Sequence, residues 1–189
     1  MPRLRTWSIA AVAVSALALA GCSSSSTATP STSAATTTPT TAAAPTTTQP
    51  TSPPAAIPAA DRSPAGTPGK APTVVVPSGT PPTSLESADL ITGTGPAAKA
   101  GDSVTVQYVL ATYSSGKTIQ SSWTSQPFTF TLGAGQVIPG WDQGVAGMQV
   151  GGRRELIIPP ALGYGSQSPG AGISADDTLV FVVDLLKIN

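Results

Sequence analysis

The sequence predicts an α+β domain in which an antiparallel β-sheet of about five strands curls over one short α-helix. Three observations lead to this class. The composition changes abruptly along the chain, short segments in the second half alternate apolar and polar residues, and one helix-spaced apolar set lies between two of them. All three Phe, all three Tyr and two of the three Trp lie at or beyond Tyr108. We therefore expect the core in the C-terminal half, where about 100 to 120 residues make one domain of ordinary size.

Four segments carry the period-two pattern of half-buried strands, and Gly, Pro or Asp residues bound each of them. A shorter apolar segment, Val74–Val76, lies between two prolines and is either an edge strand or an extended arm. The alternating faces of the four segments are Val104, Val106, Tyr108 and Leu110; Phe128, Phe130 and Leu132; Arg154, Leu156 and Ile158; and Leu179, Phe181, Val183 and Leu185.

One helix is expected between the second and third of these strands. Trp141, Val145 and Met148 are spaced i, i+4, i+7, so a helix beginning near Pro139 places all three on one face. The segment also contains three glycines, each of which costs a helix roughly 1 kcal/mol relative to Ala. Such a helix forms only when it packs against the sheet, which leads to the α+β architecture.

The N-terminal residues 1–21 have the pattern of a lipoprotein signal peptide. A basic start is followed by an apolar run of small residues, Trp7 to Ala20, which is shorter than the roughly 20 residues that span a bilayer. The run ends in Leu-Ala-Gly-Cys, which resembles a bacterial lipobox, and Cys22 is the only cysteine of the chain. We expect lipidation of Cys22 and a location on the extracytoplasmic face of the cell membrane. The alternative is an ordinary secretory peptide with a chance cysteine.

Residues 22–69 are expected to form a disordered tether, and residues 70–189 the folded domain. From Ser23 to about Ala60 nearly every residue is Ser, Thr, Ala or Pro, which offers too little apolar surface to offset the entropy of ordering. The composition fits a plain spacer that gives reach through a cell-envelope layer. A second interpretation, O-glycosylation of the Ser/Thr-Pro stretches, is compositional only.

Several function classes are excluded by what the chain lacks. There is no histidine, and Cys22 lies outside the domain, so nucleophilic triads, His-ligated metals and intrachain disulfides are not expected. The chain has 9 basic and 9 acidic side chains, and loss of Arg3 and Arg5 with the signal peptide leaves 7 against 9. The chain lacks the cluster of Lys and Arg residues that nucleic-acid binding needs. No metal or cofactor is expected.

Residues 85–189 resemble the FKBP family of prolyl isomerases. The resemblance implies an FKBP-like fold and peptidyl-prolyl cis/trans isomerisation, with Xaa-Pro segments of exported proteins as substrates and the family's macrolides as further ligands. It rests on four strings: SGKTIQSS (115–122), PFTFTLGAGQVIPGWDQGVAGMQVGGRRELIIPP (127–160), YGS (164–166) and TLVFVVDLLKI (178–188).

The same resemblance implies which residues form the site. Trp141 would be the pocket floor. If the family resemblance is set aside, core packing is the favoured interpretation of this residue. The Ile138 N–H and the Tyr164 hydroxyl would hold peptide carbonyls. The implied catalytic residues are Tyr164, Trp141 and Gln120, and the implied substrate-binding residues are Tyr108, Phe128, Val137, Ile138, Trp141, Ile173 and Phe181.

The chain departs from the family pattern at two places. Ile119 and Gln120 stand where the family usually carries Phe-Asp, so an aromatic wall becomes aliphatic and a carboxylate becomes a neutral amide. The loop at residues 172–175 departs as well. The departures bear on catalytic efficiency and not on the fold. They leave open a catalytically weak peptide-binding or chaperone module that retains the groove. A lipid-anchored small-ligand binding protein is disfavoured because its pocket needs convergent polar groups.

Overall fold

The computed structural model describes residues 53–189 of the chain. The expected signal peptide and Cys22 lie outside this part. No helix within it is long and apolar enough to cross a membrane. The elements are β1 (Ala55–Ala56), η1 (Ala59–Asp61), β2 (Glu86–Ile91), β3 (Ser103–Thr112), β4 (Thr118–Ser121), β5 (Phe128–Thr131), α1 (Pro139–Gly144), β6 (Arg153–Ile158), η2 (Pro160–Leu162) and β7 (Leu179–Ile188).

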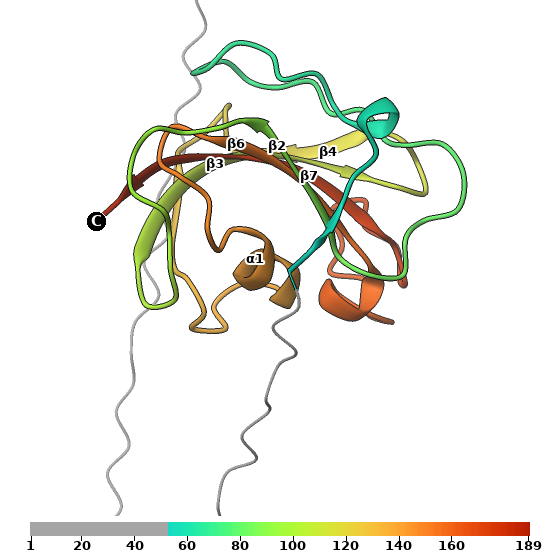
Figure 1. Cartoon of the computed structure of the whole chain (residues 1–189). Helices are drawn as coiled ribbons and strands as arrows, with labels where there is room; N and C mark the ends of the chain where they lie inside the picture. The colour runs from blue at the N-terminus through green and yellow to red at the C-terminus, as the bar shows by residue number, and fades with distance from the viewer. Residues whose placement is uncertain (1–52) are drawn as a thin grey trace, which may run out of the picture. The chain divides into compact units, whose positions relative to one another are not determined.

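A single mixed sheet forms the body of this region, with the strand order β1-β2-β6-β7-β3-β4 and β5 paired with β3. Only the β1–β2 pair is parallel. The sheet curls over α1 (Figure 1). This arrangement confirms the predicted α+β class. The sheet has more strands than expected, because β1, β2 and β4 are short or lack the clean alternation that predicted the other four.

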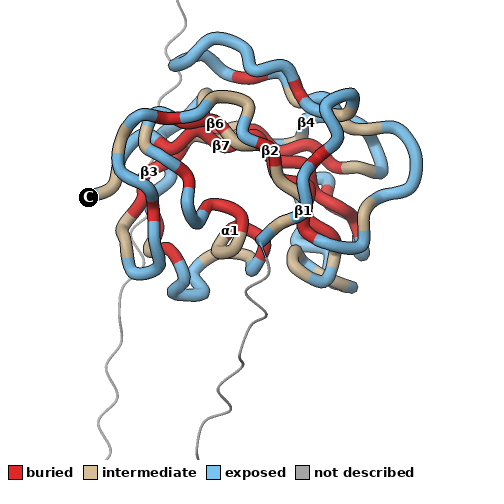
Figure 2. Tube along the Cα trace, viewed as in Figure 1, coloured by how far each residue is buried: buried red, intermediate tan, exposed pale blue. Residues whose placement is uncertain are grey.

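The inner face of the curled sheet and α1 enclose the main apolar core. The two longest strands, β3 and β7, pair along their length, with Tyr108 opposite Val183 and Leu110 opposite Phe181. Figure 2 shows the buried residues concentrated along β3, β6, β7 and α1. The core includes all three residues of the predicted helix face, Trp141, Val145 and Met148.

Helix α1 begins at Pro139, as the sequence predicts, and ends at Gly144, earlier than its apolar face suggests. Val145 and Met148 follow the helix and are still buried. The glycines allow α1 to approach β6 closely: a Cβ on Gly144 would lie 2.6 Å from the Leu156 Cδ2, and Gly140 would clash in the same way with Ile158. The close packing that the sequence analysis required is therefore present.

The outer face of the sheet is covered by residues 53–76, which we call the N-terminal arm (Figure 1). Ile57 is fully buried there against Ala88, Ile157 and Val180. Val74 and Val76 pack against the same cluster and form no strand, so the extended-arm interpretation holds. Residues 53–69 were expected in the tether, but in the structure they lie on the sheet. The ordered region thus begins before the predicted boundary at residue 70.

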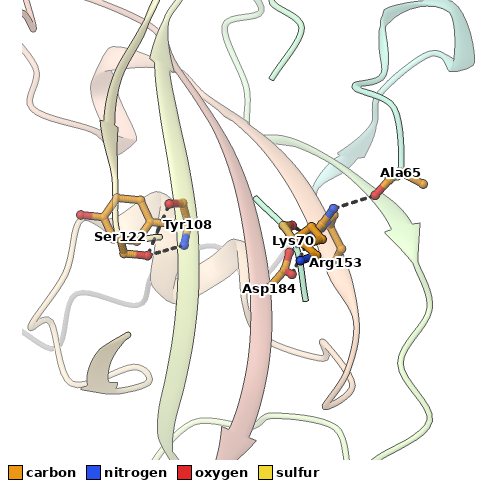
Figure 3. A network of polar contacts seen from close by, with 6 residues as sticks. All are labelled: Ala65, Lys70, Tyr108, Ser122, Arg153 and Asp184. Carbon is orange, nitrogen blue, oxygen red and sulfur yellow. Dashed lines mark hydrogen bonds and ion pairs between the residues drawn. The ribbon is translucent and has the colours of Figure 1, made fainter. Parts of the chain in front are cut away.

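Buried polar groups of the sheet hold this arm. The Ser63 N–H and hydroxyl donate to the Glu155 carboxylate at 2.8 and 2.6 Å. The Arg153 guanidinium donates to Asp184 at 2.5 and 2.7 Å and to the carbonyls of Ala65 and Lys70 at 2.7 Å each (Figure 3). Arg153 and Glu155 are almost completely buried. The arm therefore supplies hydrogen-bond partners that these side chains need.

Candidate active site

A pocket of about 440 Å³ opens on the inner face of the sheet beside α1. Its walls come from β3, β4, β5, β7, the start of α1 and the loop after η2. The pocket brings together eight of the nine residues proposed for the site from the sequence. The lining residues are Tyr108, Gln120, Phe128, Gln136, Val137, Ile138, Trp141, Tyr164 and Phe181.

Trp141 lies at the centre of an aromatic cluster. Its ring makes edge-to-face contacts with Tyr108, Phe181 and Phe128, with centroid distances of 5.3, 5.2 and 6.1 Å. Phe130 packs on it at 5.6 Å. Trp141 is buried yet borders the pocket, so it both fills the core and forms the pocket floor. Edge-to-face packing of this kind fixes the ring orientation.

Tyr108 is held in place through its backbone. Its N–H donates to the Ser122 hydroxyl oxygen at 2.8 Å (Figure 3). That hydroxyl in turn donates to the side-chain carbonyl of Gln107. Burial raises the pKa of the Tyr108 hydroxyl above its usual value, and the neighbouring Tyr164 adds to the rise. The phenol therefore stays neutral at physiological pH and acts as a hydrogen-bond donor or acceptor.

Two further polar groups at the pocket have no partner within residues 53–189: the Tyr164 hydroxyl and the Ile138 N–H. Tyr164 follows η2 in a turn that the Gly165 N–H closes on the Pro160 carbonyl at 2.9 Å. Ile138 immediately precedes α1, and its carbonyl accepts from the Trp141 N–H at 2.9 Å. Both groups can hold carbonyl oxygens of a bound peptide without breaking an existing bond.

Gln120 reaches the pocket because β4 is irregular. Leu110 pairs with Gln120 and Ala111 pairs with Thr118, so Ile119 is one extra residue on β4. Gln120 lines the pocket while Ile119 packs against the core. No hydrogen bond joins the Gln120 amide to the hydroxyl of Tyr108 or Tyr164, all three of which lie in the described part. The Gln120 amide thus lines the pocket without a hydrogen bond to either tyrosine hydroxyl.

Ile173 is not among the residues that line the pocket. Its side chain is buried in the core cluster. Its N–H donates to the Gly170 carbonyl at 3.1 Å, and its carbonyl accepts from the Ser168 hydroxyl at 2.6 Å. These bonds close the loop at residues 168–173 and turn the side chain into the core, beside the pocket instead of in its wall.

Gln136 was missed by the sequence analysis, although it opens the QVIPGW string that located Val137 and Ile138. Its amide oxygen accepts from the Thr131 N–H at 2.9 Å, which ties the end of β5 to the segment before α1. The Asp142 carboxylate, one turn into α1, accepts from the N–H groups of Gly133 and Gly135 at 2.8 and 3.1 Å. The loop between β5 and α1 is thus fixed at both ends.

The site is chemically simple. Its lining residues are apolar, aromatic, hydroxyl or amide side chains, and they include no Asp, Glu, Lys, Arg or His. It supplies an apolar floor, hydroxyl and amide groups at the rim and one backbone donor. Such a site can bind and reshape an uncharged, partly apolar group, and it needs no covalent step to do so.

Comparisons with known proteins show which family the chain is similar to. Residues 95–186 match the family of FKBP-type peptidyl-prolyl cis-trans isomerases. The chain is 51% identical over 119 residues to an FK506-binding protein of Streptomyces anulatus, covering 62% of this chain and 96% of that protein. It is 50% identical over 90 residues to the FK506-binding protein 2B of Rhizopus delemar, covering 47% of this chain and 43% of the relative.

Two solved structures share the fold. The crystal structure of AtFKBP13 is 33% identical, with a TM-score of 0.51, and the match covers 58% of this chain and 96% of that one. The crystal structure of FkpA from Escherichia coli is 38% identical, with a TM-score of 0.51 and coverage of 57% and 49%.

Proposed function

The chain belongs to the family of FKBP-type peptidyl-prolyl cis-trans isomerases, and from that premise we propose that it catalyses cis/trans rotation of Xaa-Pro bonds in exported proteins while anchored to the outer face of the cell membrane. The observation that carries the activity is the uncharged pocket floored by Trp141, whose rim holds hydrogen-bonding groups without partners in the described part of the chain. The family membership is established. The substrates and the location are the proposal.

The chemistry of prolyl rotation fits this pocket. The barrier of about 18 to 20 kcal/mol is the resonance lost when the C–N bond twists. A twisted amide is less dipolar than a planar one, so an apolar site favours the transition state over the ground state. That is differential binding in the direction catalysis needs. Neither a nucleophile nor a metal is required.

We assign roles from the family resemblance to the residues that line the pocket. The proline ring lies on Trp141 between Phe128 and Phe181, whose rings surround the indole. The Ile138 N–H and the Tyr164 hydroxyl hold the carbonyls on either side of the rotating bond. Fixing both neighbours while the central amide turns lowers the entropy cost of reaching the twisted state.

The proposed location rests on sequence alone. Cys22 ends a lipobox-like segment, and a diacylglyceryl anchor adds two acyl chains, the number that stable anchoring needs. Uncatalysed Xaa-Pro isomerisation takes tens to hundreds of seconds, which is slow for proteins folding after export. An anchored isomerase would act where such proteins emerge.

Macrolide binding belongs to the same proposal. Both curated relatives named above are FK506-binding proteins, and the pocket residues that resemble the family's site lie together in this chain. We propose that FK506 competes with peptide for this pocket. The aliphatic Ile119 in place of an aromatic wall weakens the competition.

A peptide-binding module with weak turnover is the second candidate. The observation that favours it is Gln120, which lines the pocket as a neutral amide and makes no hydrogen bond to the Tyr108 or Tyr164 hydroxyls. Replacement of Gln120 by Asp tests this. If a carboxylate stabilises the rotating amide, Gln120→Asp raises peptide turnover several-fold. One improved hydrogen bond to a charged acceptor contributes about 1 kcal/mol, and about 1.36 kcal/mol is tenfold in rate.

Two experiments test the proposal. Proline-limited refolding of an unrelated protein is measured with substoichiometric amounts of the mature chain. A catalyst accelerates it, whereas a binder slows it or must be added stoichiometrically. Separately, membrane fractions from cells expressing wild type and Cys22→Ala are compared after labelling with a lipid precursor. Absence of label on the wild type, with an unchanged membrane fraction for Cys22→Ala, would contradict the lipid anchor.

A further inference from the structure

We propose that Gln136 is a specificity-determining residue that makes this isomerase favour proline segments with an acidic side chain next to the proline. The inference rests on the proposed function, since it assigns a substrate class to the same pocket. It follows from the charges around the pocket, the orientation of one amide and the place of that amide beside the peptide-holding groups.

Within residues 53–189, no Asp, Glu, Lys, Arg or His lines the pocket. Its polar side-chain groups are two tyrosine hydroxyls, two glutamine amides and the Trp141 indole N–H, which has no hydrogen-bond partner in the described part of the chain. The raised pKa of Tyr108 keeps that phenol neutral. A charged residue beside the proline therefore meets no opposing charge within the pocket, and the polar groups at the rim decide which sign is favoured.

The hydrogen bond from Thr131 fixes the orientation of the Gln136 amide. The backbone N–H of Thr131 requires an acceptor, and it finds the Gln136 Oε1 at 2.9 Å. The two ends of a glutamine amide are distinguished by such a contact. The Nε2 group, with two donor hydrogens, then lies on the other side of the amide and has no acceptor in residues 53–189. At its place in the pocket wall, Gln136 presents donors to the occupant.

The carboxylate closest along the chain does not counteract these donors. Asp142 lies in α1, outside the set of lining residues, and its two oxygens accept from the N–H groups of Gly133 and Gly135. Its negative charge is thus engaged by the loop before Gln136. The rim on this side of the pocket remains donor-rich.

The position of Gln136 brings it near the residue that flanks the proline. It precedes Val137 and Ile138, and the Ile138 N–H is the group proposed to hold the adjacent carbonyl. A carboxylate on the flanking residue can accept from Nε2 in a charge-assisted hydrogen bond, whereas an ammonium group finds no acceptor at Nε2. The Gln136 amide therefore favours an acidic over a basic side chain beside the proline.

The replacement Gln136→Glu isolates this effect. It is isosteric and keeps an oxygen acceptor for the Thr131 N–H, so only the Nε2 donor is exchanged for a negatively charged oxygen. Turnover is measured at low salt on three peptides that differ only in the residue before proline: Glu, Leu or Lys. We expect wild type to favour the Glu peptide over the Lys peptide by about threefold or more in kcat/KM, and Gln136→Glu to reverse the order.

The matched control is Gln149→Glu, the same charge change at a residue outside the pocket lining. Gln149→Glu should leave the order of the three peptides as in wild type. In high salt, the wild-type preference for the Glu peptide over the Lys peptide should weaken. The Leu peptide separates the two possible failures. If wild type turns over none of the peptides, the proposed function fails. If it turns over the Leu peptide but treats Glu and Lys alike, or if Gln136→Glu keeps the wild-type order, the role of Gln136 is refuted.

Discussion

The two faces of the curled sheet are buried in different ways. The inner face packs apolar and aromatic side chains against α1 and leaves one pocket open beside Trp141. The outer face carries Arg153, Glu155 and Asp184, which are buried beneath the N-terminal arm. Successive side chains of β6 point alternately to the outer and the inner face, because side chains alternate along a β-strand.

This difference shows which face can bind a ligand. Leaving a small area of apolar wall exposed to solvent costs less free energy than burying an unpaired charge, so the inner face can keep a pocket for an occupant. Buried charges need every partner in place, because an unpaired charge in the interior costs several kcal/mol. The arm completes the outer face, and the inner face is left open for function. The predictions below test this division in order of decreasing effect on stability.

The largest effect is expected from Asp184→Ala. It leaves the Arg153 guanidinium buried without its carboxylate partner, which should lower the free energy of unfolding by about 3 to 5 kcal/mol. Asp89→Ala is the control, because it breaks the more exposed ion pair with Arg154. That change should cost about 1 kcal/mol or less. Chemical denaturation of both variants makes the comparison, and equal losses would show that the outer face is not held by its buried charge.

Trp141→Leu should come next. The smaller side chain leaves space among Tyr108, Phe128, Phe130 and Phe181, so we expect a loss of about 2 to 4 kcal/mol together with a loss of peptide turnover. Denaturation and turnover are measured on the same preparation. A variant that is less stable but keeps full turnover would remove Trp141 from the site.

Ser63→Ala probes the arm and carries a pH dependence. It removes the hydroxyl that donates to Glu155, at a cost of about 1.5 to 3 kcal/mol when the carboxylate is ionised. Burial raises the pKa of Glu155, and the bonds from Ser63 oppose that rise. Because the folded pKa lies above the unfolded one, protonation of Glu155 favours folding at low pH, and this contribution fades as pH rises through the folded pKa.

The cost of Ser63→Ala should therefore be smaller in acid, where Glu155 is protonated, and larger at neutral pH. Melting curves of wild type and variant across this range give the difference directly. A cost that does not change with pH would mean that the hydroxyl does not interact with an ionised Glu155.

The smallest effect on stability is expected from Tyr164→Phe. Its hydroxyl makes no hydrogen bond to any residue of the described part, so the free energy of unfolding should change by less than about 0.5 kcal/mol. Peptide turnover should fall clearly, because the hydroxyl is proposed to hold a substrate carbonyl. A loss of stability without a loss of turnover would make the hydroxyl structural.

The elements predicted from the sequence are those whose apolar residues are spaced so that one face of the element is buried. β3, β5, β6 and β7 alternate, and α1 is marked by Pro139 and the spacing of Trp141, Val145 and Met148. No such pattern marks β2 or the arm. Ile57 is the only large apolar residue between Ser23 and Arg62, and its burial depends on a hollow formed by Ala88, Ile157 and Val180 from distant segments.

Most of the pocket followed from the resemblance, and the structure places eight of those residues together. Gln136 was not assigned from the sequence, and Ile173 was assigned to the pocket but lies in the core. Both placements depend on hydrogen bonds in the loops: Thr131 to Gln136, and the closure at residues 168–173. A strand period says which face a side chain occupies, but a loop residue has no period to indicate its direction.

The most direct test of the central claim, that the open pocket of the inner face catalyses prolyl rotation, is turnover of a Leu-Pro peptide by substoichiometric mature protein. Wild type and Asp89→Ala should accelerate cis/trans exchange equally, and Trp141→Leu should lose at least about tenfold, equivalent to 1.36 kcal/mol of transition-state stabilisation. No acceleration by wild type, or equal acceleration by Trp141→Leu, would contradict the account.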